Sequence, residues 1–128
     1  MERQWEQYSY KNRGGWANVL QATLNHRGWI MFNQHTWQEL GQPRQAVLLY
    51  DRLAGVIGVR SALPLETHTL TVTTVSRSGN RAVKAKAFCR ELKINIDRTV
   101  TFEAPVLENG VLVLDLAKTR PLNRGMEV

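Results

Sequence analysis

The sequence contains few of the residues that small proteins use for crosslinking or for anchoring in a membrane. Its only cysteine is Cys89, so an internal disulfide and a multi-cysteine zinc site are both excluded. It has no run of about 18 apolar residues, the length that a membrane span needs. The first six residues include Glu2 and Glu6 and lack the apolar region of a secretory signal. We therefore expect a cytoplasmic protein that does not contact a membrane.

The motifs of common enzyme classes are absent as well. There is no Gly-x-Ser-x-Gly motif, no phosphate-binding loop and no dinucleotide fingerprint, and the scattered carboxylates form no acid/base pair. His26 and His35 have no Cys or carboxylate at ligand spacing, so neither a metal site nor a cofactor is predicted. Neighbouring cations could activate the thiol of Cys89, but a buried structural cysteine is the expectation. These observations predict a non-enzyme.

Positive charge is what the sequence has in excess. It contains 17 Lys and Arg against 11 Asp and Glu, a formal net charge of +6, which favours acidic partners and nucleic acid first. Much of the excess lies in residues 77–98, where only Glu91 and Asp97 oppose the basic residues. These are Arg77, Arg81, Lys84, Lys86, Arg90, Lys93 and Arg98. The cluster fits two interpretations, a surface that contacts phosphates or a solvated helix face.

The hydrophobic pattern favours β-strands. Hydrophobic residues make up 43% of the chain, which is enough to bury a core. Two short helices are expected, 34–40 capped by Asn33 and 84–92. The tail after Lys118 is expected to be loose. The expected strands are 19–24, 29–32, 56–60, 67–75 and 81–83, and a final hairpin of 98–104 and 111–116 closed through Glu108-Asn109-Gly110. The predicted fold class is mainly β with short helices.

Residues 43–54 fit two structures. Pro43 at a first helical position and Gly55 as a stop, with apolar residues between them, are typical of a helix. The same stretch also fits a strand at 46–50 that turns at 51–55 into the next strand. Periodicity alone does not separate the two for so short a run.

An internal repeat favours the hairpin at 46–60. Each half of the chain contains a strand, a turn with a glycine (Gly28 or Gly79), a second strand, a short helix ending in Glu-Leu, and a hairpin. We divide the chain accordingly. The segments are an N-terminal leader (1–18), a first unit (19–62), a second unit (63–117) and a C-terminal tail (118–128).

Three stretches of the first unit follow the pattern of a known family. They are Ala22-Thr23-Leu24-Asn25-His26-Arg27-Gly28-Trp29-Ile30, Trp37-Gln38-Glu39-Leu40-Gly41 and residues 46–62. This unit resembles the AbrB/MraZ/MazE swapped-hairpin family, and residues 69–117 resemble it more loosely. The resemblance implies a duplicated swapped-hairpin, β-barrel-like core and binding of double-stranded DNA as a transcription regulator or antitoxin.

The resemblance and the charge together select the candidate DNA contacts. Arg27 is the only basic residue in the first unit's turn and helix, because Trp29 follows Gly28 where DNA-binding family members usually carry Arg. The second unit is therefore expected to make most phosphate contacts. The predicted DNA-binding residues are Arg27, Arg77, Arg81, Lys84, Lys86 and Arg90. The alternative is a protein-interaction module, antitoxin-like or an assembly protein without DNA activity, in which Trp29 and Trp37 contact the partner.

The core is predicted from alternation along the strands and from the apolar helix faces. One unit of about 50 residues buries too little apolar surface to be secure alone, so the two units are expected to pack together or the chain to form a homodimer. The residues expected inside are Ile30, Phe32, Leu40, Val47, Leu49, Ile57, Val59, Val83, Leu92, Val100, Phe102, Leu112 and Leu114.

Overall fold

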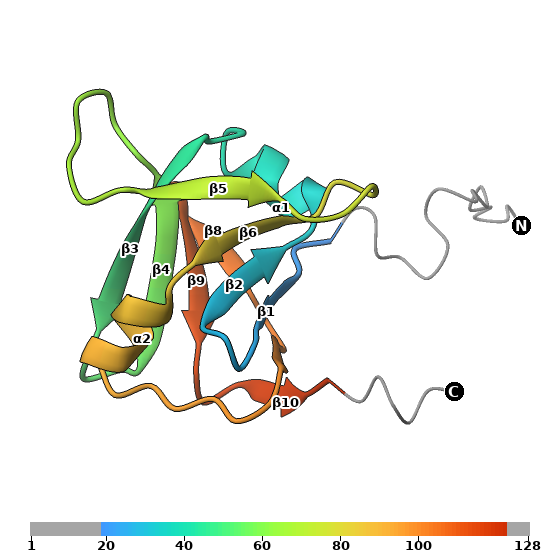
Figure 1. The fold of residues 1–128 in the computed structure, drawn as a ribbon, viewed down its shortest axis with the longest axis vertical. Coiled ribbons are helices and arrows are strands. Elements are labelled where there is room, and N and C mark those ends of the chain that lie inside the picture. The colour runs from blue at the N-terminus through green and yellow to red at the C-terminus, as the bar shows by residue number, and fades with distance from the viewer. Residues whose placement is uncertain (1–18, 123–128) are drawn as a thin grey trace, which may run out of the picture.

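The computed structural model describes residues 19–122, which form ten β-strands and two short helices (Figure 1). The strands are β1 (Ala22–Leu24), β2 (Trp29–Phe32), β3 (Gln45–Asp51), β4 (Val56–Ser61), β5 (Leu70–Thr74), β6 (Arg81–Lys84), β7 (Val100–Phe102), β8 (Val106–Glu108), β9 (Val111–Asp115) and β10 (Thr119–Pro121). The helices are α1 (Gln34–Glu39) and α2 (Lys86–Glu91). The predicted class, mainly β with two short helices, is confirmed. The predicted leader, residues 1–18, lies outside the described residues.

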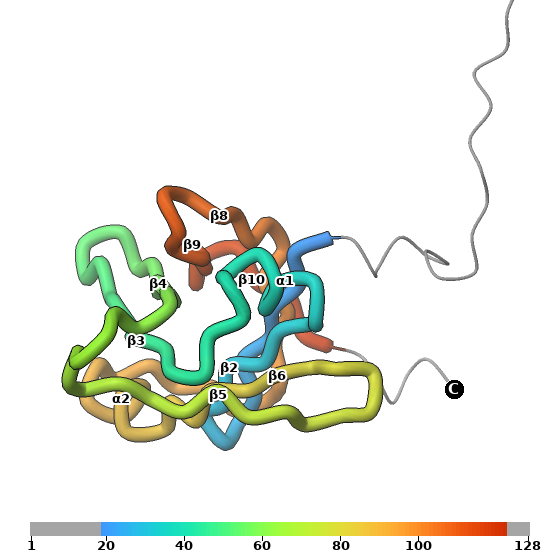
Figure 2. Tube along the Cα trace, turned by 90° about the horizontal axis from the view of Figure 1, so that it is seen from above, coloured from blue at the N-terminus to red at the C-terminus, as the bar shows by residue number. Residues whose placement is uncertain are grey.

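All ten strands belong to one antiparallel sheet, in the order β10-β7-β1-β2-β6-β5-β3-β4-β9-β8. The sheet curls into a half-barrel and wraps around the interior (Figure 2). Its inner face carries alternate residues of each strand, such as Leu24 in β1, Ile30 in β2 and Leu112 in β9, all of them fully buried. The core is therefore shared by strands from both ends of the chain.

Residues 43–54 are not a helix. β3 and β4 form the predicted hairpin, with Ala46 opposite Ser61 and Asp51 opposite Val56. The turn between them is closed locally, because the Asp51 carboxylate accepts a hydrogen bond from the backbone N–H of Ala54 at 3.0 Å. Gly58 is required at its position, since a Cβ there would lie 2.9 Å from Cγ1 of Val111. The hairpin prediction is confirmed and the helical alternative is wrong.

The pairings that join the two halves follow one pattern. β2 pairs with β6, and β4 pairs with β9. β1 pairs with β7 of the second half, and β5 in turn pairs with β3 of the first half. If β1 is exchanged with β5, β2 with β6, β3 with β7 and β4 with β9, the same four pairings result. Helix α1 and helix α2 both follow directly on the equivalent strands, β2 and β6.

Two predictions about the end of the chain are wrong. The predicted strand at 98–104 does not pair with 111–116, because β7 pairs with β1 and β10 while the separate strand β8 pairs with β9. Pro105 lies between β7 and β8, and a proline interrupts a strand because it has no backbone N–H for the ladder. The tail is not loose where it begins, because β10 pairs with β7, and residues 123–128 lie outside the described residues. The Asn109-Gly110 turn does close a hairpin, with positive φ at both residues.

The predicted core is largely confirmed. Ten of the thirteen predicted residues are buried, Leu92 and Val100 are half-buried, and Leu49 is 39% exposed. Leu48 and Tyr50, the neighbours of Leu49, pack against the core. Because side chains alternate along a strand, Leu49 lies on the other face of β3, and the predicted register is wrong at this residue. Cys89 is buried, as predicted, and burial raises the pKa of its thiol.

Candidate nucleic-acid interface

Trp29 is the centre of a group of side chains on the outer face of the sheet. It begins β2 directly opposite Lys84 of β6, so the two side chains lie on the same face. Lys84 Nζ lies 4.9 Å from the centroid of the Trp29 ring, and Arg27 Cζ lies 5.7 Å from it. Both distances are typical of cation–π contacts, which hold a cation against an aromatic face. Trp29 therefore gathers one cation from each half of the chain.

The turn that carries Arg27 is fixed against the start of α2. The Asn25 side chain accepts hydrogen bonds from the backbone N–H groups of Arg27 and Trp29, at 3.0 and 2.9 Å. Gly28 has φ +80°, and a Cβ at this residue would lie 2.7 Å from the Cα of Lys86. The carbonyl of Gly28 accepts a hydrogen bond from Ala85 at 2.8 Å. Only glycine permits this approach, which brings the first half's turn to the second half's helix.

Helix α2 presents two more cations to solvent. Lys86 and Arg90 are one helical turn apart, so they share a face, and both are exposed. The other side of the helix is anchored, because Cys89 is buried and the Phe88 ring packs edge-on against Tyr50 with centroids 6.1 Å apart. Because these contacts hold α2 in one orientation, Lys86 and Arg90 stay on its exposed side.

These four residues, Arg27, Lys84, Lys86 and Arg90, are called the basic surface below. The turn before β2 and helix α2 lie at the same end of the molecule, and the connection from α2 to β7 runs along that end (Figure 1). That connection contains Lys93 and Arg98, opposed by Asp97. The surface is therefore composed of both halves and not of the second half alone.

Arg77 and Arg81 belong to a different place. Arg81 opens β6 and Lys84 closes it, and residues three apart in a strand point to opposite faces. The Arg81 guanidinium lies 3.8 Å from the centroid of the Trp37 ring and donates a hydrogen bond to the carbonyl of Gly79. The turn that contains Arg77 packs on α1, since a Cβ at Gly79 would meet the Gln34 side chain. Arg81 therefore does not share a face with Lys84, and Arg77 lies in the turn beside α1.

Trp29 and Trp37 are also held in different contacts. The indole N–H of Trp37 donates to the carbonyl of Pro43 at 3.0 Å, and Arg81 covers its ring. Trp29 lies on the outer face of β2 between Arg27 and Lys84. Both tryptophans are half-buried, and a cation lies over each ring. The two tryptophans thus lie beside separate groups of basic residues.

A groove of about 610 Å³ extends from the basic surface along the outer face of β1 and β2. Arg27, Trp29 and Met31 form one part of it. Hydroxyl and amide groups form much of the rest, and they are Thr23, Asn25, Ser76, Asn80, Thr99 and Thr101. Such groups commonly bind phosphate oxygens without reading sequence.

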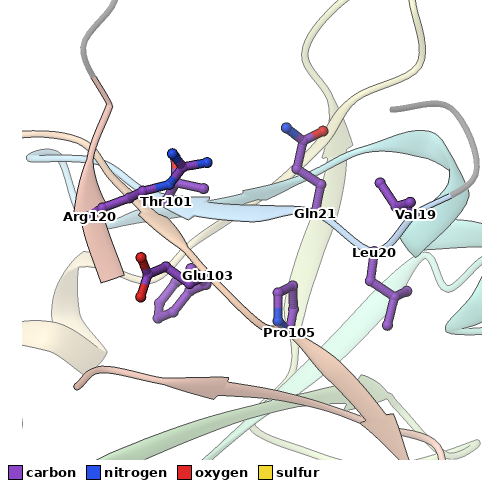
Figure 3. A pocket seen from close by; sticks show the side chains of 8 residues that line it. Val19, Leu20, Gln21, Thr101, Glu103, Pro105 and Arg120 are labelled. Carbon is purple, nitrogen blue, oxygen red and sulfur yellow. The ribbon is translucent and has the colours of Figure 1, made fainter. Parts of the chain in front are cut away.

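A separate cavity of about 460 Å³ lies beside β7, where the chain passes from β7 to β8 (Figure 3). Val19 and Leu20 lie at the opposite end of it from Arg120 (Figure 3). Glu103 adds a carboxylate, and no ion pair within 4.0 Å joins it to Arg120 in the described part of the chain. Since this cavity contains both signs of charge, it does not extend the basic surface.

Two other features are absent from residues 19–122. No three His, Cys, Asp or Glu side chains gather closely enough to hold a metal ion in this part of the chain. Neither of its two helices has the length and apolar character of a membrane span. Comparison of the chain with protein-family models, curated proteins and solved structures gave no match. The family resemblance therefore stays a prediction from the residues.

Proposed function

We propose that the chain is a small DNA-binding, regulator-like protein that contacts duplex phosphates through the basic surface. The observation that carries this proposal is the convergence of Arg27, Lys84, Lys86 and Arg90 from two halves of the chain onto one end of the molecule. No ion pair engages any of the four among residues 19–122. Phosphate binding requires cations that are held in position by the fold and are not already paired with acidic side chains.

The environment of the cations favours this use. The Trp29 ring restricts Arg27 and Lys84, so less side-chain freedom is lost when a phosphate is bound. The part of the adjoining groove that lies beside Arg27 adds the amide of Asn25 and the hydroxyl of Thr99. Such contacts position a duplex and specify no sequence, so we expect weak sequence preference from this surface alone.

The strand pairings support the family resemblance behind the proposal. We interpret the exchange of β3 and β7 between the halves as a duplicated swapped-hairpin core, as the AbrB/MraZ/MazE resemblance implies. One departure from that family matters. The helix α1 carries Gln34, His35 and Gln38 where α2 carries Lys86 and Arg90, so we propose that charge contact is confined to one end of the molecule.

The test is binding of a mixed-sequence 20-base-pair duplex, followed by fluorescence anisotropy at several salt concentrations. Two to four phosphate contacts predict a log–log salt slope of about −2 to −3.5. Lys86→Gln and Arg90→Gln should each weaken binding and reduce the magnitude of the slope by up to about 1. The matched control is Arg77→Gln, which removes one exposed positive charge from the other end of the molecule and should leave both values unchanged.

Two results would contradict the proposal. One is the absence of binding at low salt. The other is an Arg77→Gln variant that loses as much affinity as Lys86→Gln, since binding would then follow net charge and not the basic surface.

A further inference from the structure

The connection between β4 and β5 displays leucine side chains to solvent. Leu63 is 66% exposed and Leu65 is 101% exposed. Leu65 also has φ +66°, in the left-handed region that leucine rarely adopts. The connection extends away from the sheet at the end of the molecule opposite to α2 (Figure 1). Both side chains are therefore available for contact with another molecule.

The connection is nevertheless fixed in place. Arg60 donates two hydrogen bonds to the Glu66 carboxylate, at 2.9 and 2.6 Å. The same carboxylate accepts the backbone N–H of Leu63 at 2.9 Å, and the N–H of Glu66 returns a bond to the carbonyl of Leu63. The backbone N–H of Ala62 donates a hydrogen bond to the carbonyl of Gln45 in β3. The leucines are thus presented by a preorganised segment, which lowers the entropy that a partner must remove.

A groove of about 470 Å³ lies between this connection and the start of β3. Pro43, Leu63, Pro64 and Leu65 give it apolar walls, and Arg44 lines it as well. Glu66, its only carboxylate, is already engaged by Arg60. Arg44 is exposed and has no carboxylate within 4.0 Å among residues 19–122. The groove therefore combines apolar surface with one uncompensated positive charge.

We propose that Leu63, Leu65 and Arg44 form a docking site for a protein segment with apolar side chains and a carboxylate. The apolar side chains would cover the two leucines, and the carboxylate would pair with Arg44. A single positive charge without an aromatic platform does not fit a nucleic acid strand. A contact with a second copy would bring together two chains that each carry a formal net charge of +6. The site is distinct from the basic surface, so both can be occupied at once.

The experiment uses the full chain labelled with ¹⁵N and a synthetic amphipathic peptide that has leucines on one face and glutamates on the other. Addition of the peptide should shift the backbone amides of residues 41–45 and 61–69 other than those of Pro43 and Pro64, which have no N–H. Leu63→Ser/Leu65→Asn should weaken binding at least tenfold, and Arg44→Gln several-fold. Asparagine is chosen at position 65 because it tolerates positive φ. The matched control is Leu53→Ser, which removes a leucine that is 102% exposed in another turn and should leave binding unchanged.

Several results would overturn the proposal. These are shift changes confined to residues 25–29 and 84–91, unaltered binding by the double variant, or equal binding of a peptide with lysines in place of the glutamates. Self-association of the chain that the double variant abolishes, measured by sedimentation, would assign the site to a second copy instead. None of these results depends on whether the chain binds DNA.

Discussion

The Glu66 carboxylate is the most strongly perturbed acid in the described part of the chain. Hydrogen bonds from the Arg60 side chain, and then from the Leu63 backbone, lower its pKa from the ordinary 4.5 to about 2. Because the folded pKa lies below the unfolded one, the stabilising effect is complete above about pH 4.5 and is lost as the pH falls through 2. The Leu63 amide donates to this carboxylate, so its NMR shift should titrate with a midpoint near 2. A midpoint near 4.5 would show that the pair does not form in solution.

Phe102 is a single residue whose substitution tests the predicted core. Its side chain is 3% exposed, at the end of β7. Phe102→Ala should reduce the free energy of unfolding by about 3–5 kcal/mol, because it removes a buried ring and leaves a cavity. Leu53→Ala, at a fully exposed position, should change it by less than about 0.5 kcal/mol. Denaturant melts of the two variants give the comparison, and a loss below about 0.5 kcal/mol for Phe102→Ala would place the ring on the surface.

Among the elements, the turn before β2 depends on its glycine in two ways. Gly28 and Gly110 both have positive φ, but a Cβ at Gly28 would meet the backbone of Lys86 whereas one at Gly110 would meet nothing within 4 Å. Gly110→Ala should therefore cost only the conformational penalty of about 1–2 kcal/mol. Gly28→Ala should cost clearly more and shift the amides of α2. Equal losses in thermal melts would mean that the turn and α2 are not in contact.

The same elements show what the sequence could and could not predict. The Asn33 cap of α1 and the Asn109-Gly110 turn were predictable, because each is a local interaction between residues close in the chain. The predicted strand 98–104 ends before Pro105, but the sequence did not indicate the separate strand β8 after it or the pairing of β7 with β1 and β10. The position of Arg81 on Trp37, and of Gly28 against Lys86, involves residues more than 40 apart in sequence. No local pattern encodes such contacts, so the sequence could not show that Arg81 lies apart from Lys84.

At the scale of the whole molecule, the two halves should unfold together. β1–β7 and β5–β3 pair across the halves, so neither half can lose its strands without exposing the other. The described tryptophans report on the first half, and the buried Cys89 reports on the second. Tryptophan fluorescence and the reactivity of the Cys89 thiol should give the same denaturant midpoint. Separate midpoints would mean that the halves are independent units.

We propose that duplex DNA binds at the end of the molecule where both halves contribute cations. An NMR titration of the ¹⁵N-labelled chain with a mixed-sequence duplex tests it most directly, because the indole N–H groups of Trp29 and Trp37 report on the two ends separately. The account predicts salt-sensitive shift changes at the Trp29 indole and at residues 25–29 and 84–91, with the Trp37 indole and residues 76–81 unchanged. No shift changes at low salt, or changes confined to Trp37 and residues 76–81, would contradict it.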